Sequence, residues 1–408
     1  MPSPTSNRIL SLLSLAELLS MSLWFAGTAV LPQLAAQWHA GLNVTSWLTL
    51  AVQLGFVVGA LLSATFNLAD VFHAPRLMAV SMILGALCNA GFAMVGAKSI
   101  AGAIIFRFLT GAALAGVYPP GMKILAGWFR DRRGMALGFM IGALAIGSAL
   151  PHGVHALGAI TQDNWKYVVM SSSMLSVLAA FIVALFIHDG PYAAPSQPFD
   201  IRQVAQVMHN RRVRLATYGY LGHMWELYSM WGWIAVMLTA SVSATQHSTL
   251  SIAEVRFAAF VIIAVGFVGC WWAGIVSDRA TNEDAFTRMC QRSRVTIIAM
   301  AVSGACCLLA ALFFHNIYAL MLIGLVWGVS VVADSAQFSA IISEAADPLY
   351  IGTALTLQTA LGFFLTVIGI RVTALIGEHY GWPLAAASLA IGPSLGIVAM
   401  WRLQLQKR

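Results

Sequence analysis

The sequence predicts an all-α integral membrane protein with twelve transmembrane helices in two six-helix, pseudo-symmetric halves. Of its 408 residues, 60% are hydrophobic and only 9% are charged, whereas soluble domains are about a quarter charged. A chain surrounded by lipid must pair its backbone polar groups internally, as helices or as a closed barrel. Its apolar runs are about twenty residues or longer, which is the length of a membrane-spanning helix.

The apolar runs fall into two sets of six, each run bounded by charged or turn-forming residues. The first set covers residues 8–32, 44–69, 76–97, 100–124, 134–158 and 165–188. The second set covers residues 214–238, 252–277, 293–314, 317–343, 350–376 and 382–403. The polar, proline-containing stretch Asp189–Arg214 separates the sets. We therefore expect an N-terminal bundle at 1–190, a cytoplasmic linker at 191–213 and a C-terminal bundle at 214–408.

Lysine and arginine lie mostly on one side of these runs. With both termini in the cytoplasm, 17 of the 22 basic residues fall in cytoplasmic segments. Lys98, Lys166 and Arg256 fall on the other side, and Arg107 and Arg371 fall inside helices. Basic loops are retained in the cytoplasm, so membrane topology accounts for the net charge of +7 without a nucleic-acid partner. We expect a bacterial inner (plasma) membrane protein with both termini cytoplasmic.

The two halves carry similar charged residues at corresponding positions. Asp70 follows the second run with Arg76 nearby, and Asp278 with Arg279 follows the eighth run, 208 positions later. Duplicated halves are common in secondary transporters, whose substrate site lies between the repeats near the middle of the bilayer. A carboxylate at a helix end can pair with a basic group or with the N-terminus of a neighbouring helix. These residues and Gly274 form a predicted gating motif; the alternative is that they are solvated loop charges.

Several short motifs carry a resemblance to a known family. Residues 274–279, Gly-Ile-Val-Ser-Asp-Arg, match the start of a loop motif, and residues 107–111 and 128–134 match patterns around the fourth helix. The order and spacing of these motifs on twelve helices resemble the major facilitator superfamily, and the resemblance covers nearly the whole chain. The first copy of the loop motif departs from the pattern, with Phe66 in place of glycine and Val71 in place of a basic residue. The resemblance implies that helices 1, 4, 7 and 10 line a central cavity.

Two narrower resemblances are weaker. The glycines of the fifth helix resemble an antiporter motif, but Leu150 precedes Pro151 where that motif has glycine. Close helix packing also explains these small residues. The stretch 63–70 resembles nitrate and nitrite porters, but their asparagines and substrate-binding arginines are missing, so nitrate is disfavoured.

Polar and ionisable groups within the apolar runs are the candidate substrate and proton pathway. Each charge in hydrocarbon costs about 2.5–3.5 kcal/mol, so it marks a functional candidate. The candidates are Glu17, Arg107, His152, His155, His223, Glu226, Asp334, Gln337 and Arg371.

Estimated depths separate these candidates. Glu226 falls near the middle of its helix, and Glu17 and Asp334 fall closer to the cytoplasmic side. A carboxyl group at the middle of the bilayer is costly to ionise, so we predict that Glu226 carries a coupling proton. Arg371 lies close enough to its helix end to reach the interface instead, and His223 could pair structurally with Glu226, since residues i and i+3 share a helix face.

The sequence favours a proton-coupled secondary transporter of a small solute. The arginines and histidines within its helices favour a small organic anion as that solute. His152 and His155 share a helix face but lack a third ligand, so we expect no metal and no cofactor. No nucleotide-binding motif or catalytic nucleophile motif is present, which argues against an enzyme. We expect a monomer in the lipid bilayer. The alternatives are a membrane-embedded sensor, receptor or non-transporting enzyme and, within transport, efflux of drugs or metabolites.

Overall fold

The computed structural model describes residues 4–129, 132–157, 165–193, 200–245, 248–279, 284–347 and 350–406, apart from the side chains of Leu42, Asn43 and Asp70. Within these ranges, eleven helical segments are long and apolar enough to cross a membrane. The twelfth span is the first in the chain, which is divided into α1 (Pro4–Met21), α2 (Ala26–Ala29) and α3 (Leu31–Trp38). The predicted twelve-helix fold is therefore confirmed, and we number its spans 1 to 12 in chain order.

The N-terminal half contains spans 1 to 6. After span 1 it consists of α4 (Leu42–Thr45) with α5 (Trp47–Thr65), the short α6 (Leu68–Val71), α7 (Ala74–Val95), α8 (Ile100–Leu114) with α9 (Tyr118–Trp128), α10 (Arg133–Leu157) and α11 (Trp165–Phe186). The 3-10 helix η1 (Ile201–Gln203) and α12 (Val204–His209) follow, within the expected linker.

The C-terminal half contains spans 7 to 12. It consists of α13 (Arg211–Ala244), α14 (Ile252–Ala264) with α15 (Gly266–Asp278), α16 (Ala285–Leu312), α17 (Ile317–Val331) with α18 (Ser335–Ala345), α19 (Ile351–Tyr380), and α20 (Trp382–Leu389) with α21 (Ile391–Gln404). Span 7 begins at Arg211 because Asn210 caps it, its side chain accepting hydrogen bonds from the N–H groups of Arg212 and Val213.

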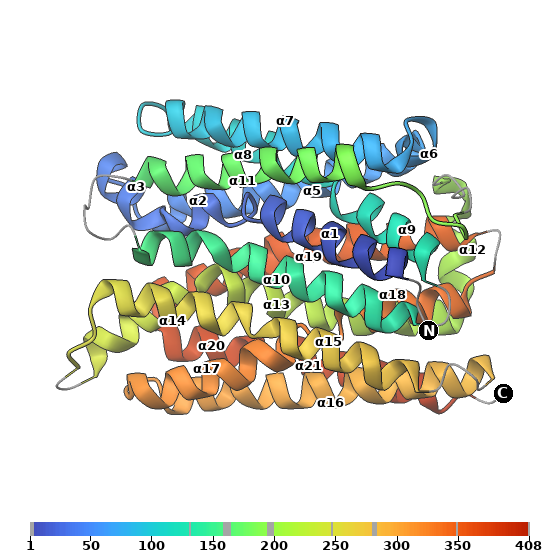
Figure 1. Cartoon of the computed structure of the whole chain (residues 1–408). Coiled ribbons are helices and arrows are strands. Elements are labelled where there is room, and N and C mark those ends of the chain that lie inside the picture. The colour runs from blue at the N-terminus through green and yellow to red at the C-terminus, as the bar shows by residue number, and fades with distance from the viewer. Residues whose placement is uncertain are drawn as a thin grey trace.

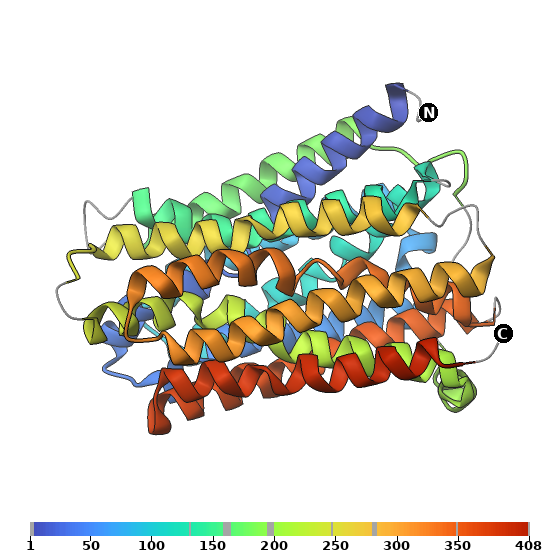
Figure 2. The same ribbon diagram turned by 90° about the horizontal axis from the view of Figure 1, so that it is seen from below.

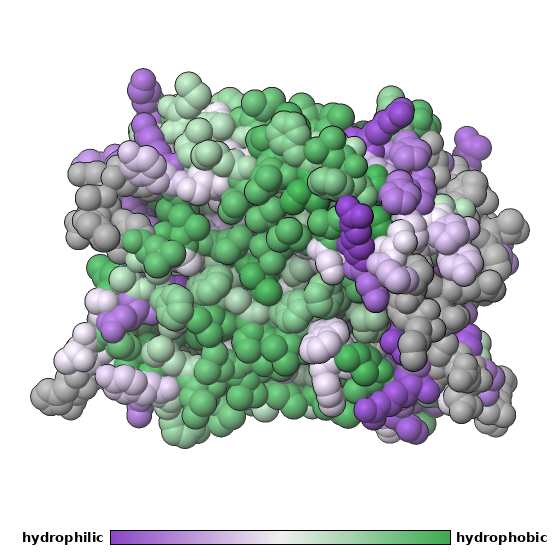
Figure 3. Space-filling model, in the orientation of Figure 1, coloured by the Kyte–Doolittle hydropathy of each residue, from purple (hydrophilic) through white to green (hydrophobic). Residues whose placement is uncertain are grey.

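The spans run roughly alongside one another, and both termini lie at the same end of the bundle (Figure 1). We call this the terminal end and the opposite one the far end. Apolar side chains form a broad belt between two more hydrophilic ends (Figure 3), as expected for a protein surrounded by lipid. The bundle therefore crosses the membrane along the line that joins its two hydrophilic ends.

Several spans are interrupted, and three of the breaks fall in spans that the resemblance assigned to the cavity. Span 1 is broken at 22–25, span 4 at 115–117 and span 10 at 332–334. The interruption between α17 and α18 is visible in Figure 2. Asp334 was expected within a continuous helix but lies at this break, directly before α18, and its side chain does not cap that helix.

The halves meet where α10 packs against α14 and α15, and where α19 packs against α5. The first of these contacts is very close. A Cβ atom added at Gly138 would lie 2.4 Å from the backbone oxygen of Cys270, and one added at Gly274 would lie 2.4 Å from that of Gly134. This favours the packing explanation for the fifth-helix glycines, since small residues let helix backbones approach closely.

Candidate functional site

A cavity of about 620 Å³ lies between the two halves. The N-terminal half contributes residues of α9 and α10, and the C-terminal half contributes residues of α13, α18 and α19. Toward the terminal end its walls carry Lys123, Arg133 and Glu344, of which Arg133 is exposed to solvent. The cavity therefore opens at the terminal end.

Aromatic contacts between the halves lie at the inner end of the cavity. The ring of Trp24 in span 1 lies 5.6 Å from that of Tyr228 and 5.5 Å from that of Phe363 in the C-terminal half. Phe56 and Phe363 are closer still, at 4.3 Å between ring centroids. Because all four rings are buried, this aromatic cluster separates the cavity from the far end.

Arg371 forms another contact between the halves. Its guanidinium donates to Ser46 Oγ at 3.0 Å, which joins α19 to the start of α5. Arg371 does not line the cavity. In this conformation Arg371 therefore joins the two halves, and its predicted role in substrate binding stays a prediction.

His223 and Asp334 form a buried pair at the cavity wall. His223 Nδ1 lies 2.9 Å from Asp334 Oδ1, and His223 Nε2 lies 2.8 Å from Ser335 Oγ. Asp334 accepts no hydrogen bond of good geometry from the described residues, so the ion-pair contact is its main polar interaction. The sequence suggested Glu226 as the partner of His223, and the break in span 10 brings Asp334 there instead.

Glu226 faces away from the cavity, into the C-terminal half. Its Oε1 accepts hydrogen bonds from Trp327 Nε1 at 2.6 Å and Cys307 Sγ at 3.2 Å, and its Oε2 accepts one from Ser303 Oγ at 2.9 Å. The side chain is 1% exposed. Its predicted coupling role stays a prediction, and in this conformation Glu226 does not reach the cavity.

Glu17 is completely buried in the N-terminal half, and neither of its carboxyl oxygens has a hydrogen-bond partner among the described residues. It lies behind α9, where a Cβ atom added at Gly121 would be 3.3 Å from Glu17 Oε2. Tyr118, one turn earlier on α9, lines the cavity. Glu17 is thus separated from the cavity by a single helix.

The Arg107 side chain donates hydrogen bonds to the backbone at the break in span 1. Its guanidinium donates to the carbonyl of Leu23 at 2.9 Å, to Asn89 Oδ1 at 3.0 Å and also to the carbonyl of Trp24. Those carbonyls lie in the turn between α1 and α2, where they lack helical partners. The arginine therefore meets backbone carbonyls and an amide rather than a carboxylate or the cavity.

His152 and His155 lie on α10 away from the cavity. His155 Nδ1 donates to the carbonyl of Ala29 at 2.8 Å, and its Nε2 lies 2.9 Å from the side-chain amide of Gln33. In the other orientation of that amide, its oxygen accepts from Arg256 at 2.9 Å and so links span 1 to span 8. Among the described residues no third metal ligand joins the two histidines.

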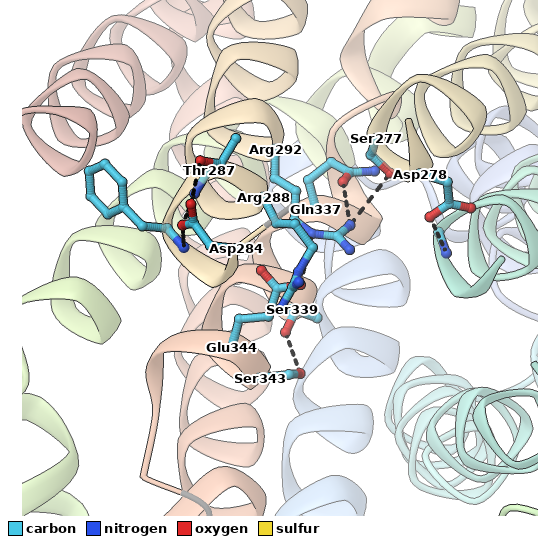
Figure 4. A network of polar contacts seen from close by, with 12 residues as sticks. Ser277, Asp278, Asp284, Thr287, Arg288, Arg292, Gln337, Ser339, Ser343 and Glu344 are labelled. Atoms are coloured by element: carbon cyan, nitrogen blue, oxygen red, sulfur yellow. Dashed lines mark hydrogen bonds and ion pairs between the residues drawn. The ribbon is translucent and has the colours of Figure 1, made fainter. Parts of the chain in front are cut away.

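The predicted contact between Asp278 and a neighbouring helix is present. Its two carboxylate oxygens accept hydrogen bonds from the backbone N–H groups of Gly134 at 3.0 Å and Met135 at 2.7 Å, at the start of α10 (Figure 4). Gly274 lies against the backbone at the same place. Arg76 and Arg279 are exposed, and the side chain of Asp70 lies outside the described part of the chain.

A polar network at the terminal end joins the candidate Gln337 to Arg292 and Glu344, which sequence reasoning missed (Figure 4). Arg292 on α16 donates to Gln337 Oε1 at 3.1 Å, to Glu344 Oε1 at 3.3 Å and to Ser277 Oγ at 3.4 Å. It also lines the cavity. The sequence assigned Arg292 to a cytoplasmic loop, but Asp284 caps α16 and places the arginine two turns inside that helix. The signal that could have found it is the aspartate cap.

The site lies between two halves of a twelve-span bundle, and the family comparison agrees with that architecture. The sequence profile described as Major Facilitator Superfamily matches residues 13–291, which is more than half of the chain. No curated protein matches the chain closely enough to serve as a relative. On the strength of the profile and the fold, the chain belongs to the major facilitator superfamily.

Proposed function

We propose that this membrane transporter is a proton-coupled secondary transporter that moves a small organic anion by alternating access. The observation that carries the proposal is the cavity of about 620 Å³ between the halves, open at the terminal end and separated from the far end by the aromatic cluster. Rocking the halves about such a site would expose it to the two sides of the membrane in turn.

The charges and rings of the cavity support an anion with an apolar body. Lys123, Arg133 and Arg292 line it against one carboxylate, that of Glu344. The inner part is lined by aromatic side chains, including Tyr228 and Phe363. An anion attracted by the basic entrance could bury its apolar part against the rings.

Buried ionisable groups support coupling to protons. Glu17 and Asp334 are fully or almost fully buried in spans 1 and 10. Ionising such groups in the membrane interior is costly, and they recur in the proton relays of transporters. The His223–Asp334 pair supports a proton path that reaches the cavity wall.

Orientation and gating complete the proposal. The terminal end is cytoplasmic, in a bacterial inner membrane, because the basic residues gather there. The contact of Asp278 with the start of α10 stabilises the conformation that is open at that end. The protein acts as a monomer and needs no cofactor.

The test is transport by the purified protein in liposomes. We expect saturable counterflow of an organic anion at equal pH, and accumulation of the same anion when only a pH difference is imposed. A panel of organic anions, neutral metabolites and hydrophobic cations identifies the substrate class. Absence of saturable flux for every class, under both conditions, would favour a sensor or non-transporting enzyme. Flux restricted to hydrophobic cations would favour drug efflux.

A further inference from the structure

The first spans of the two halves contain similar eight-residue stretches. Residues 17–24 read Glu-Leu-Leu-Ser-Met-Ser-Leu-Trp, and residues 226–233 read Glu-Leu-Tyr-Ser-Met-Trp-Gly-Trp, 209 positions later. Five of the eight positions are identical: the glutamate, the first leucine, the serine, the methionine and the last tryptophan. Glu17 and Glu226 therefore occupy the same place in the two halves.

Their neighbours agree in part as well. Glu17 lies near Gly121 of span 4 and in the same small space as Met78 of span 3, whose Cε is also 3.3 Å from a Cβ added at Gly121. Glu226 meets Ser303 of span 9 and Trp327 of span 10. Each glutamate thus lies beside the fourth span of its own half.

Their surroundings differ. Three donors face the Glu226 carboxyl, so this group is stabilised even when it is ionised. No described residue donates to Glu17, and the side chains around it include Met78 and Met140. An ion in such a place loses its hydration without compensation, so burial without a donor favours the neutral, protonated form of Glu17.

The repeat also differs in backbone conformation. In the C-terminal half, residues 226–233 lie within the continuous helix α13, whereas in the N-terminal half α1 ends at Met21 and the chain turns before α2. The broken copy carries Glu17, which accepts no hydrogen bond from the described part of the chain. The break makes α1 a segment separate from the rest of span 1, whereas the corresponding part of α13 is continuous.

Only α9 separates Glu17 from the cavity, and α9 is itself a separate segment. The break at 115–117 divides it from α8, and Pro119 and Pro120 stand in its first turn. Among the described residues, the titratable groups close to Glu17 include Tyr118 of α9 and Tyr228 of α13, both at the cavity wall. The packed elements α10 and α7 contribute Met140 and Met78. A shift of α9 or α1 would therefore open Glu17 to the water of the cavity.

We propose that Glu17 binds and releases the coupling proton as α1 and α9 move, and that Glu226, its counterpart in the repeat, keeps its hydrogen bonds throughout the cycle. The inference rests on the proposed proton-coupled transport, and assigns the proton to the N-terminal half. It replaces the choice of Glu226 that depth alone suggested.

The two glutamates form a matched pair of test sites. In liposomes, Glu17→Gln should abolish pH-driven accumulation and retain counterflow at equal pH, because the amide imitates the protonated acid. Glu226→Gln should retain both activities. Accumulation by Glu17→Gln at the parental level, or its loss in Glu226→Gln alone, would overturn the assignment. Absence of counterflow in the parent protein would instead count against the proposed function.

An infrared measurement tests the proton without any substrate. The purified parent protein should show the carbonyl stretch of a buried, protonated carboxyl group that disappears reversibly as the pH rises. This band should be absent from Glu17→Gln and present in Glu226→Gln. A band that persists unchanged in Glu17→Gln would overturn the proposal even if transport were never detected.

A glycine substitution provides a third readout that keeps both carboxyl groups. Gly121→Ala would place a methyl group 3.3 Å from Glu17 Oε2 and should shift the pH at which the infrared band disappears. Gly127→Ala on the same helix faces Ala193, at 3.4 Å, and should leave that pH unchanged. Equal behaviour of the two alanine variants would contradict the placement of Glu17 behind α9.

Discussion

The Asp278 carboxylate of the C-terminal half lies 3.0 Å from the backbone nitrogen of Gly134, at the first turn of α10 in the N-terminal half. A negative charge at a helix N-terminus stabilises the contact by about 0.3–2 kcal/mol. Asp278→Asn keeps one acceptor but removes the charge. We expect the population open at the terminal end to fall several-fold.

Labelling of single cysteines placed at either end of the cavity would measure this shift. Labelling at the far end should rise in Asp278→Asn. The matched control is Asp284→Asn, since Asp284 caps its own helix α16 by accepting from the N–H groups of Phe286 and Thr287. Unchanged labelling at both ends, together with an unchanged transport rate, would remove Asp278 from the gate.

Arg107 should matter for folding more than for substrate binding. Arg107→Ala leaves the carbonyls of Leu23 and Trp24 and the oxygen of Asn89 without their donor. An unpaired buried polar group costs about 1–3 kcal/mol, so we expect a clearly lower unfolding temperature in detergent. Arg107→Lys should restore only part of the lost unfolding temperature, since an ammonium group cannot reproduce the planar set of donors. The exposed Arg76→Ala is the control. A normal unfolding temperature with weakened substrate affinity would reverse this interpretation.

The Glu226 side chain should stabilise the C-terminal half through Trp327. Glu226→Ala removes the acceptor of three buried donors, at about 1–3 kcal/mol for each donor left unpaired. Glu226→Gln retains an oxygen that can accept from Trp327 Nε1. Thermal unfolding should therefore rank the parent first, Glu226→Gln second and Glu226→Ala last. Equal stability of the two variants would show that the Trp327 contact contributes little.

Two side chains of the polar network should affect anion affinity in opposite directions. Arg292→Ala removes a cation from the cavity wall and should raise KM by about tenfold, equivalent to about 1.4 kcal/mol. Glu344→Gln removes the opposing carboxylate and should lower KM. Arg288→Ala provides the control, because Arg288 contacts Glu344 but is absent from the cavity wall. Changes of the same sign in Arg292→Ala and Glu344→Gln would contradict an anionic substrate.

The sequence predicted the architecture well because hydropathy and the positions of charged loops depend on each residue alone. It predicted the partners of buried groups poorly. The break before Asp334, which brings it to His223, depends on packing between spans. Residues 332–334 include no proline or glycine that would mark this break in the sequence. The Glu226 side chain likewise bonds to Ser303 and Trp327, which lie far away in the chain, so its partners could not be predicted from nearby residues.

The aromatic cluster that joins Trp24 and Phe56 to Tyr228 and Phe363 gives the transport cycle a dependence on temperature. Opening the far end must part these buried rings and wet them, which carries a positive heat capacity change. Contacts of this kind weaken on cooling. Cold should therefore weaken the contact between the halves at the far end, and moderate warming should strengthen it.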